Sequence, residues 1–137
     1  MEYYLNDEAA TETCGKELAS QLKPPFVIYL TGQLGAGKTT WVRGVLRGFG
    51  FSGTVKSPTF TLVEEYDLTV GMIYHFDLYR LNDAKELQYI GIETYFHPQS
   101  IVLIEWPEHG AGFLPPPNWV LSFKIMELGR LLTLSKH

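Results

Sequence analysis

Residues 32–39 hold the residue types best suited to chemistry in this sequence. They read Gly-Gln-Leu-Gly-Ala-Gly-Lys-Thr, which fits the pattern Gly-x-x-x-x-Gly-Lys-Ser/Thr. Glycine tolerates the backbone angles with which a loop turns its N–H groups inward around an anion. We expect the Lys38 side chain to be in solvent in the empty protein and to reach the β- and γ-phosphates when a nucleotide binds. The Thr39 hydroxyl can bind Mg²⁺. The pattern therefore predicts a phosphate-binding loop for a nucleoside triphosphate.

The segments on either side of this loop support the prediction. Residues 26–31 are short, apolar and rich in β-forming side chains, as a buried strand is. After the loop, apolar side chains recur at helical spacing from Trp41 to Phe49. The motif requires a strand, a glycine loop and a helix in this order, because the helix N-terminus presents its positive end to the phosphates.

Charge is unevenly distributed along the chain. Acidic residues number 15 against 11 lysines and arginines, yet no acidic residue occurs between Leu18 and Val63. We expect a positive field around the loop, which suits a triphosphate, with Arg47 on a solvated helix face. The acidic total argues against an extended nucleic-acid surface, although one basic patch could still contact RNA.

Two carboxylates follow apolar strands and could manage a metal ion. Glu105 directly follows residues 101–104, and Asp77 directly follows residues 73–76. In open α/β sheets, ligands bind at the carboxyl ends of the strands, and a phosphate loop needs a carboxylate partner for Mg²⁺. Either acid could instead cap the turn that follows it, and the sequence does not rank the two.

Other polar and aromatic residues leave alternatives open. Hydroxyls at Ser57, Thr59 and Thr61 could sense a γ-phosphate as switch segments do, or they could form an ordinary Ser-Pro turn. Trp106 could cover the nucleotide or simply pack. The histidines at 75, 97 and 109 lack the spacing of zinc ligands.

Composition indicates a single domain spanning residues 1–137. A hydrophobic content of 45% argues against a disordered chain, and no apolar run approaches the roughly 20 residues that cross a membrane. The N-terminus lacks signal-peptide character. Cys14 is the single cysteine, which excludes an internal disulfide, and it fits a small core residue in a helical pattern with Leu18 and Leu22. These features predict a cytoplasmic protein without membrane contact.

The remaining pattern predicts an α/β fold. A first helix, capped by Asn6 or Asp7, ends before Pro24. The other expected elements are a hairpin with strands 59–66 and 72–76, a short helix through Tyr89 that Asn82 or Asp83 caps, a strand at 101–104, and a hairpin with strands 120–125 and 131–134 that turns at Gly129. Together they give a P-loop NTPase-like mixed β-sheet with flanking helices, in which antiparallel hairpins extend a parallel nucleotide-binding core.

Four further segments accompany the loop Gly32–Thr40. They are Val55-Lys-Ser-Pro-Thr-Phe-Thr-Leu-Val-Glu-Glu-Tyr66, Tyr74-His-Phe-Asp-Leu-Tyr-Arg-Leu81, Glu86-Leu87 with Ile90-Gly-Ile92, and Ile104-Glu-Trp-Pro107. In this order the five segments extend over nearly the whole chain, and they resemble the TsaE family, formerly called YjeE. The phosphate loop alone is unspecific, so the other segments carry the resemblance.

The resemblance implies an ATP- and Mg²⁺-dependent ATPase that supports the threonylcarbamoyl modification of tRNA. The modified adenosine lies beside the anticodon in tRNAs that read codons beginning with A. The implied protein partners are TsaB and TsaD; TsaD carries the transferase chemistry, and TsaC makes the threonylcarbamoyl-adenylate. We expect a chain that is monomeric alone, hydrolyses ATP weakly without its partners, and meets tRNA through the complex.

The resemblance also assigns residues by position. Catalysis falls to Lys38, Asp77 and Glu105; Thr39 and Glu105 bind Mg²⁺, while Asp77 serves the metal or the attacking water. The switch consists of Ser57, Thr59 and Thr61. The residues assigned to the phosphates are Leu34, Gly35, Ala36, Gly37, Lys38, Thr39 and Thr40, and those assigned to the base and sugar are Glu8, Glu108 and Arg130. Trp106 joins the predicted nucleotide site on its own position after Glu105, without help from the resemblance. One departure is Gln33, where the family usually has Asp; we expect altered water contacts without loss of binding.

The residues alone also allow other functions. A small-molecule kinase would use the same loop and acids, but its arginine-bearing lid is not evident, since Arg130 is the only arginine after Arg80. A regulatory GTPase would carry Asn-Lys-x-Asp and Asp-x-x-Gly, and neither occurs. A nucleotide-binding module without hydrolysis stays open, because no arginine is identifiable as an internal finger.

Overall fold

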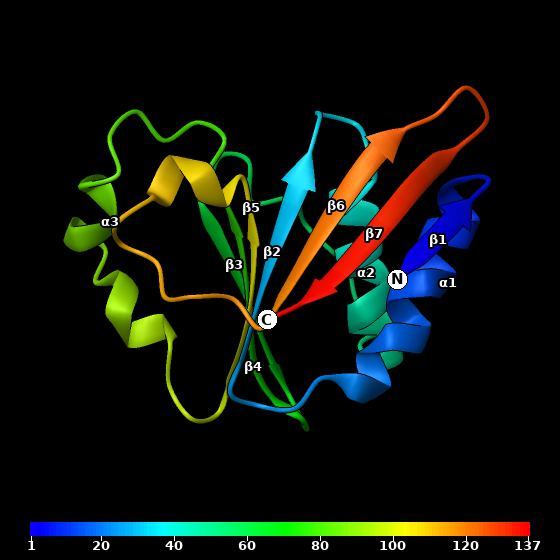
Figure 1. The fold of residues 1–137 in the computed structure, drawn as a ribbon. Coiled ribbons are helices and arrows are strands. Elements are labelled where there is room, and N and C mark those ends of the chain that lie inside the picture. Colours follow the sequence, from blue (N-terminus) through cyan, green and yellow to red (C-terminus); the bar gives the residue numbers. More distant parts are fainter.

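A seven-stranded sheet runs through the molecule, with helices on both of its faces (Figure 1). The computed structural model describes residues 1–137, and the strand order is β1-β7-β6-β2-β5-β4-β3. The elements are β1 Glu2–Leu5, α1 Glu8–Leu18, η1 Ala19–Gln21, β2 Phe26–Gly32, α2 Lys38–Gly48, β3 Val63–Leu68, β4 Gly71–Asp77, α3 Glu86–Tyr89, η2 Ile92–Tyr95, β5 Ser100–Glu105, η3 Pro107–Gly110, β6 Trp119–Ile125 and β7 Arg130–Lys136.

The centre of the sheet is parallel and its edges are antiparallel. Strands β6, β2, β5 and β4 pair in parallel, whereas β3 pairs antiparallel with β4, and β7 with both β6 and β1. The expected mixed sheet with antiparallel hairpins is therefore confirmed. Because the central strands are parallel, the carboxyl ends of β2, β4 and β5 meet at one edge, where Asp77 lies directly opposite Glu105.

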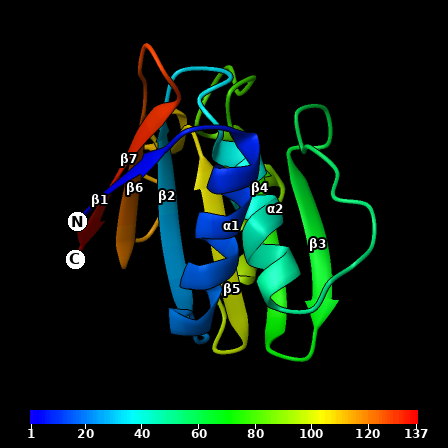
Figure 2. The same ribbon diagram turned by 90° about the vertical axis from the view of Figure 1, so that its right-hand side faces the viewer.

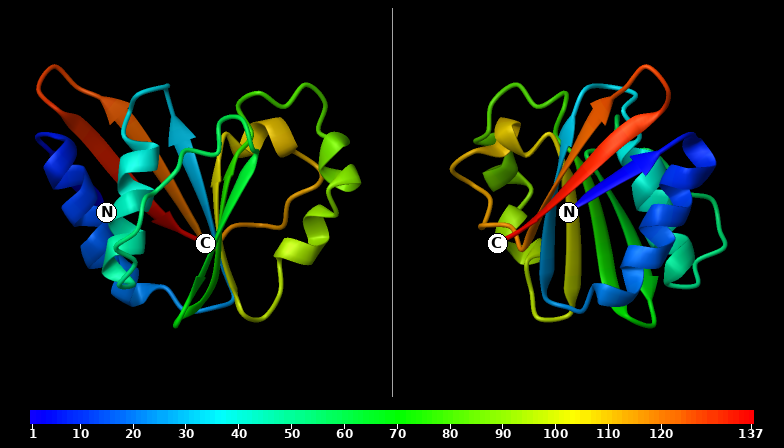
Figure 3. Two further views of the ribbon diagram at one scale, coloured as in Figure 1. Left: turned by 180° about the vertical axis from the view of Figure 1, so that it is seen from behind. Right: turned by 45° about the vertical axis from the view of Figure 1, so that its right-hand side comes forward.

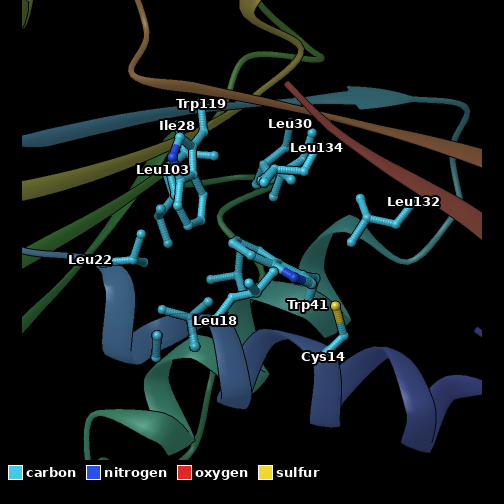
Figure 4. Close-up of a cluster of buried hydrophobic side chains, with 14 of the residues drawn as sticks. Cys14, Leu18, Leu22, Ile28, Leu30, Trp41, Leu103, Trp119, Leu132 and Leu134 are labelled. Carbon is cyan, nitrogen blue, oxygen red and sulfur yellow. The ribbon is translucent and has the colours of Figure 1, made fainter. Parts of the chain in front are cut away.

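Helices α1 and α2 lie side by side on one face of the sheet (Figure 2). This face holds the larger apolar cluster, of 21 buried residues. Trp41 is fully buried at its centre, between Cys14 and the side chains of the sheet (Figure 4). The two helix backbones approach so closely at Gly44 that a Cβ there would overlap the carbonyl of Glu12. This packing fixes α2, and with it the loop that precedes α2.

The opposite face is covered by α3, η2, η3 and the irregular segments between them (Figure 3). Its apolar cluster has seven buried residues, among them Phe76, Leu87 and Ile104. Odd-numbered residues of β4 and β5 face the α1–α2 side and even-numbered ones face this side, as the alternation of a strand requires. None of the helices combines the length and the apolar character that crossing a bilayer requires.

Several expected boundaries are confirmed and others are corrected. Asp7 caps α1 by accepting a hydrogen bond from the Ala10 amide at 2.8 Å. Strand β1 was not expected; it pairs with β7 at the edge of the sheet. The strand expected at 59–66 begins only at Val63, because residues 58–62 form a turn that ends in a left-handed residue, Leu62 (φ 71°).

The short helix was expected to be capped by Asn82 or Asp83, and this is wrong, because the residue before it is Lys85 and no side chain caps it. Helix α3 begins at Glu86. The Asp83 carboxylate accepts the Lys85 amide, and the Glu86 carboxylate accepts the amides of residues 82 and 83. These side chains therefore stabilise a turn before the helix instead of capping the helix itself.

Candidate functional site

The phosphate loop connects β2 to α2 at the carboxyl edge of the sheet. Gly32, Gly35 and Gly37 have φ values of 134°, 76° and 105°, a region that side-chain-bearing residues avoid. Gly37 precedes α2 without any side-chain cap. The first N–H groups of a helix lack internal partners, so this end of α2 offers backbone donors to an anion.

Lys38 is held inside the protein, not in solvent as its role had led us to expect. Its side chain is 4% exposed, its Nζ donates to the Gly32 carbonyl at 2.5 Å, and the same atom lies 4.1 Å from the centre of the Trp106 ring. Burial lowers the pKa of Lys38, and the charges of Glu105, Asp77 and Glu108 partly oppose that shift. The ammonium group thus already points into the site.

Glu105 lies at the end of β5 and accepts two hydrogen bonds on one oxygen. Its Oε2 receives the Thr39 hydroxyl at 2.8 Å and lies 2.6 Å from Nε2 of His75. Burial opposes ionisation of Glu105, but the bond and charge of His75, the Thr39 bond and the charge of Lys38 outweigh it, so the pKa of Glu105 is lowered. The carboxylate is therefore ionised at neutral pH.

Asp77 stands beside Glu105 and has the opposite electrostatic character. Its Oδ1 accepts the Tyr79 amide at 3.0 Å. Burial raises the pKa of Asp77; the Tyr79 bond and the charges of His75 and Lys38 lower it, whereas Glu105 raises it further. Neighbouring carboxyl groups whose pKa values are pushed apart are suited to different roles in one reaction.

The oxygen atoms here fit a magnesium ion. Mg²⁺ prefers hard oxygen ligands and commonly uses only one or two protein side chains beside phosphates and water. Thr39 and Glu105 present a hydroxyl and an ionised carboxylate in direct contact, at the mouth of the phosphate loop. The donor set of the structure therefore agrees with the metal that the motif implies.

These side chains line one cavity of about 350 Å³. The residues around it are Glu8, Leu34, Gly35, Gly37, Lys38, Thr39, Thr40, Ser57, Thr59, Asp77, Glu105, Trp106 and Arg130. Each of these had been assigned to the site from the sequence. Three other assigned residues lie outside the cavity. Ala36 is fully buried, Thr61 hydrogen-bonds Glu64 at 3.2 Å, and Glu108 lines a neighbouring groove.

Arg130 reaches the phosphate loop from the start of β7. A Cβ on Gly37 would lie 2.5 Å from its Nη1, so the glycine makes room for the guanidinium. The Nε of Arg130 is buried without a hydrogen-bond partner. Glu8, on the same rim, pairs with Arg43 at 2.8 Å. The edge of the cavity therefore carries a cation, Arg130, and an acid, Glu8, from elements distant in sequence.

The other two arginines near the loop point elsewhere. Arg43 bridges Glu8 and Glu12 of α1, and Arg47 donates to the carbonyls of residues 51 and 53. Arg47, expected on a solvated helix face, is half-buried, and its guanidinium also binds these two carbonyls of the segment after α2. The positive character of the cavity comes from Lys38 and Arg130 instead.

Trp106 both packs and lines the cavity. It adopts a left-handed conformation (φ 57°), which is costly for a bulky residue. Its ring stacks on His109 with centroids 5.5 Å apart and contacts Tyr79 at 5.0 Å. These aromatic neighbours support the ring where it covers Lys38.

Comparison with known proteins places this site in a family. The family model described as "Threonylcarbamoyl adenosine biosynthesis protein TsaE" matches residues 5–131. The chain belongs to the TsaE family. It is 47% identical over 136 residues to the tRNA threonylcarbamoyladenosine biosynthesis protein TsaE of Haemophilus influenzae, covering 96% of this chain and 86% of that one. A TsaE protein of Synechocystis is 46% identical over 79% of this chain and 71% of its own length.

A solved structure supports the same conclusion at the level of the fold. The crystal structure of Bacillus subtilis YdiB superposes with a TM-score of 0.83 at 30% identity, covering 99% of this chain and 84% of that one. The TsaE family is nucleotide-binding, which agrees with the cavity around the phosphate loop.

One polar residue of this TsaE chain's site was missed from the sequence. His75 had been considered only as a zinc ligand, yet it is fully buried and contacts Glu105. The available signal was strand alternation, because residues 75 and 77 share a face of β4. Parallel pairing of β4 with β5 then brings His75 near Glu105, and that pairing is not visible in the sequence.

Proposed function

We propose that this chain is an ATPase whose turnover supports the threonylcarbamoyl modification of tRNA adenosine beside the anticodon. The observation that carries the proposal is the convergence of Lys38, the Thr39–Glu105 contact and Asp77 on one cavity at the mouth of a phosphate loop. The family's description names the modification. The cavity supplies the groups that phosphoryl transfer needs, which are positioning donors and charge.

ATP would enter with its phosphates over the loop. Lys38 exchanges the Gly32 carbonyl and the Trp106 ring for the β- and γ-phosphates, because charge-assisted hydrogen bonds to phosphate are stronger than those to a carbonyl. The backbone of residues 34–40 surrounds the phosphates. Arg130 and Glu8 stand on the rim where the sugar and base would lie.

Thr39 and Glu105 would hold Mg²⁺, which when bound neutralises charge on the phosphate oxygens. Asp77 would act on the attacking water. Its raised pKa makes its ionised form a stronger base than an ordinary aspartate. Thr39→Ala and Glu105→Ala should therefore weaken ATP binding more with Mg²⁺ than with EDTA.

The partners in this proposal are TsaB and TsaD, with tRNA reached through them. Phosphoryl transfer is commonly completed by a residue or an ordered switch supplied in trans. The switch segment, residues 57–61, contributes Ser57 and Thr59 to the cavity but presents Phe60 to solvent with 85% exposure. Docking of TsaB and TsaD on this side would order the segment, and we expect the chain alone to be a monomer and a slow ATPase.

A reconstituted reaction tests the proposal. Purified TsaB, TsaD, tRNA and ready-made threonylcarbamoyl-adenylate are mixed with this chain and ATP, so that no other step requires ATP. We expect many modified tRNAs per complex with the parent chain. Lys38→Ala, or an ATP analogue that resists hydrolysis, should stop the reaction near one round. Sustained modification with this chain omitted would contradict the proposal.

A further inference from the structure

His75 is the one fully buried histidine of the chain, and its only polar contact is in the site. It lies on β4 with no exposed surface, and its Nε2 is 2.6 Å from Oε2 of Glu105. The other ring nitrogen, Nδ1, is buried and has no hydrogen-bond partner. Around it on this face of the sheet lie Ile73, Ile101 and Leu103, all fully buried.

Packing does not account for a histidine at this position. A buried polar atom without a partner loses its hydration and gains nothing in return. An apolar side chain of similar volume would fill the same space among the surrounding isoleucines and leucine without that cost. The benefit that offsets it must come from Nε2, the atom that contacts Glu105.

The direction of the hydrogen bond follows from the charge of Glu105. The lowered pKa of Glu105 makes it an ionised carboxylate, which only accepts hydrogen bonds. Nε2 must therefore carry the proton and donate it. Nδ1 on the other side of the ring contacts no polar group, so Nε2 is the one ring atom through which His75 acts on the site.

The two hydrogen bonds on Glu105 differ in permanence. Thr39 lies in the first turn of α2 and can turn its hydroxyl to a metal ion, whereas His75 is enclosed by the sheet and cannot follow. Both bonds converge on Oε2. When Thr39 turns away, His75 alone fixes the orientation of the carboxylate.

We propose that His75 is a positioning residue that acts through Glu105: its Nε2–H holds the carboxylate in the orientation that Mg²⁺–ATP requires. Partners behind a metal ligand fix its orientation and basicity in just this manner. The inference rests on the proposed function, because it takes Glu105 as a ligand of the metal.

Matched substitutions separate positioning from packing. In His75→Gln the amide nitrogen stands where Nε2 stood and can still donate to Glu105. In His75→Asn the amide nitrogen stands only where Nδ1 stood and cannot reach it, and His75→Leu removes the donor. His97→Gln is the control, because His97 bonds the Tyr74 hydroxyl on the other face of the sheet.

Calorimetric titration with ATP, in Mg²⁺ and in EDTA, gives a readout independent of hydrolysis. Without Mg²⁺ we expect all four variants to bind ATP as the parent does. With Mg²⁺, the leucine and asparagine variants should lose about tenfold or more of the affinity that the metal adds, while His75→Gln and His97→Gln keep it. If Mg²⁺ raised the ATP affinity of His75→Leu as much as that of the parent, the inference would be overturned. Equal ATP affinities of the glutamine and asparagine variants in Mg²⁺ would overturn it as well.

Two further measurements remove ambiguity. Nitrogen NMR of the unmodified protein should show a proton on Nε2 of His75; an Nε2 without a proton would overturn the inference even if a variant failed to fold. Glu105→Gln separates the two proposals. If it loses the Mg²⁺ gain while His75→Leu keeps it, only the role of His75 is wrong. If Glu105→Gln keeps the gain, the metal role of Glu105 is wrong and the inference falls with it.

Discussion

The phosphate loop and the switch segment face the same cavity, but they are held in different ways. The loop is anchored at both ends, since β2 before it and α2 after it are buried in the larger apolar cluster. Side chains of Lys38 and Thr39 tie it further to Gly32 and Glu105. The switch segment has mainly local hydrogen bonds, between the hydroxyls of Ser57 and Thr59 and from the Leu62 amide to the Pro58 carbonyl.

This difference separates binding from triggering. A loop fixed by packing is complete before the ligand arrives, so it loses little conformational entropy on binding. A segment with few buried contacts is drawn from the least stable part of a fold, which is where switching elements are found. We therefore expect changes in the loop to alter affinity, and changes in the switch segment to alter turnover.

The largest expected effect is on ATP affinity, from Lys38→Ala. The variant loses charge-assisted bonds to phosphate, and we expect affinity to fall about 100-fold by calorimetry. The fold should melt no earlier, because burial lowers the pKa of Lys38 and its charge therefore costs stability in the free protein. Lys56→Ala, at an exposed lysine outside the cavity, is the control. Unchanged affinity in Lys38→Ala would show that the loop does not hold the phosphates.

Asp77→Asn should separate turnover from stability. The amide keeps an acceptor for Tyr79 but cannot take a proton, so hydrolysis should fall about 100-fold while ATP affinity changes little. Because burial raises the pKa of Asp77, its ionised form destabilises the fold at neutral pH. The variant should thus melt at a higher temperature than the parent at pH 7.

That gain in stability should vanish as the pH falls below 3.8, the ordinary aspartate value, because Asp77 then becomes protonated in both the folded and the unfolded chain. Glu105→Gln should behave in the opposite sense. The lowered pKa of Glu105 means that its charge stabilises the fold above the ordinary glutamate value of 4.5 and that this is lost at lower pH. Melting curves between pH 3 and 7 check both; a lower melting temperature for Asp77→Asn at pH 7 would be inconsistent with the buried charge.

The smallest expected effect is in the switch segment. Thr59 lines the cavity, whereas Thr61 bonds Glu64 outside it. Thr59→Ala should lower ATP turnover in the presence of TsaB and TsaD about threefold to tenfold, the loss of one hydrogen bond, with ATP affinity unchanged. Thr61→Ala should match the parent in both measurements. If the two variants behave alike, the division between loop and switch segment does not hold at the level of single hydroxyls.

The sequence predicted the anchored part of this molecule better than the rest. The spacing of apolar residues and the composition predicted β2, α2 and β5, because these elements are buried and their apolar pattern is strong. The strand expected to begin at Thr59 begins only at Val63. The alternation of apolar and polar residues continues through the turn that ends at Leu62, so the sequence does not reveal the turn. Strand β1 is short and half-exposed, so its sequence shows no alternation from which a strand could be predicted.

The residues of the site were likewise predicted well where they depend on local sequence and poorly where they depend on contacts across the sheet. The loop motif and the two strand-end acids were readable because each depends on local sequence. Contacts made across the sheet were not, and they include His75 behind Glu105 and Arg130 over Gly37. Burial of Lys38 was also missed, because it depends on Trp106 arriving from the end of β5.

Tryptophan fluorescence tests most directly whether ATP binds in this cavity. Trp106 lines it, whereas Trp41 is fully buried and Trp119 is 5% exposed at the start of β6. Binding draws the Lys38 ammonium away from the Trp106 ring and brings phosphate near it, so ATP should change the emission of the parent. The same change, at the same ATP concentration, should occur in Trp119→Phe and be absent in Trp106→Phe. A full ATP-dependent signal in Trp106→Phe would place the nucleotide elsewhere and contradict the account.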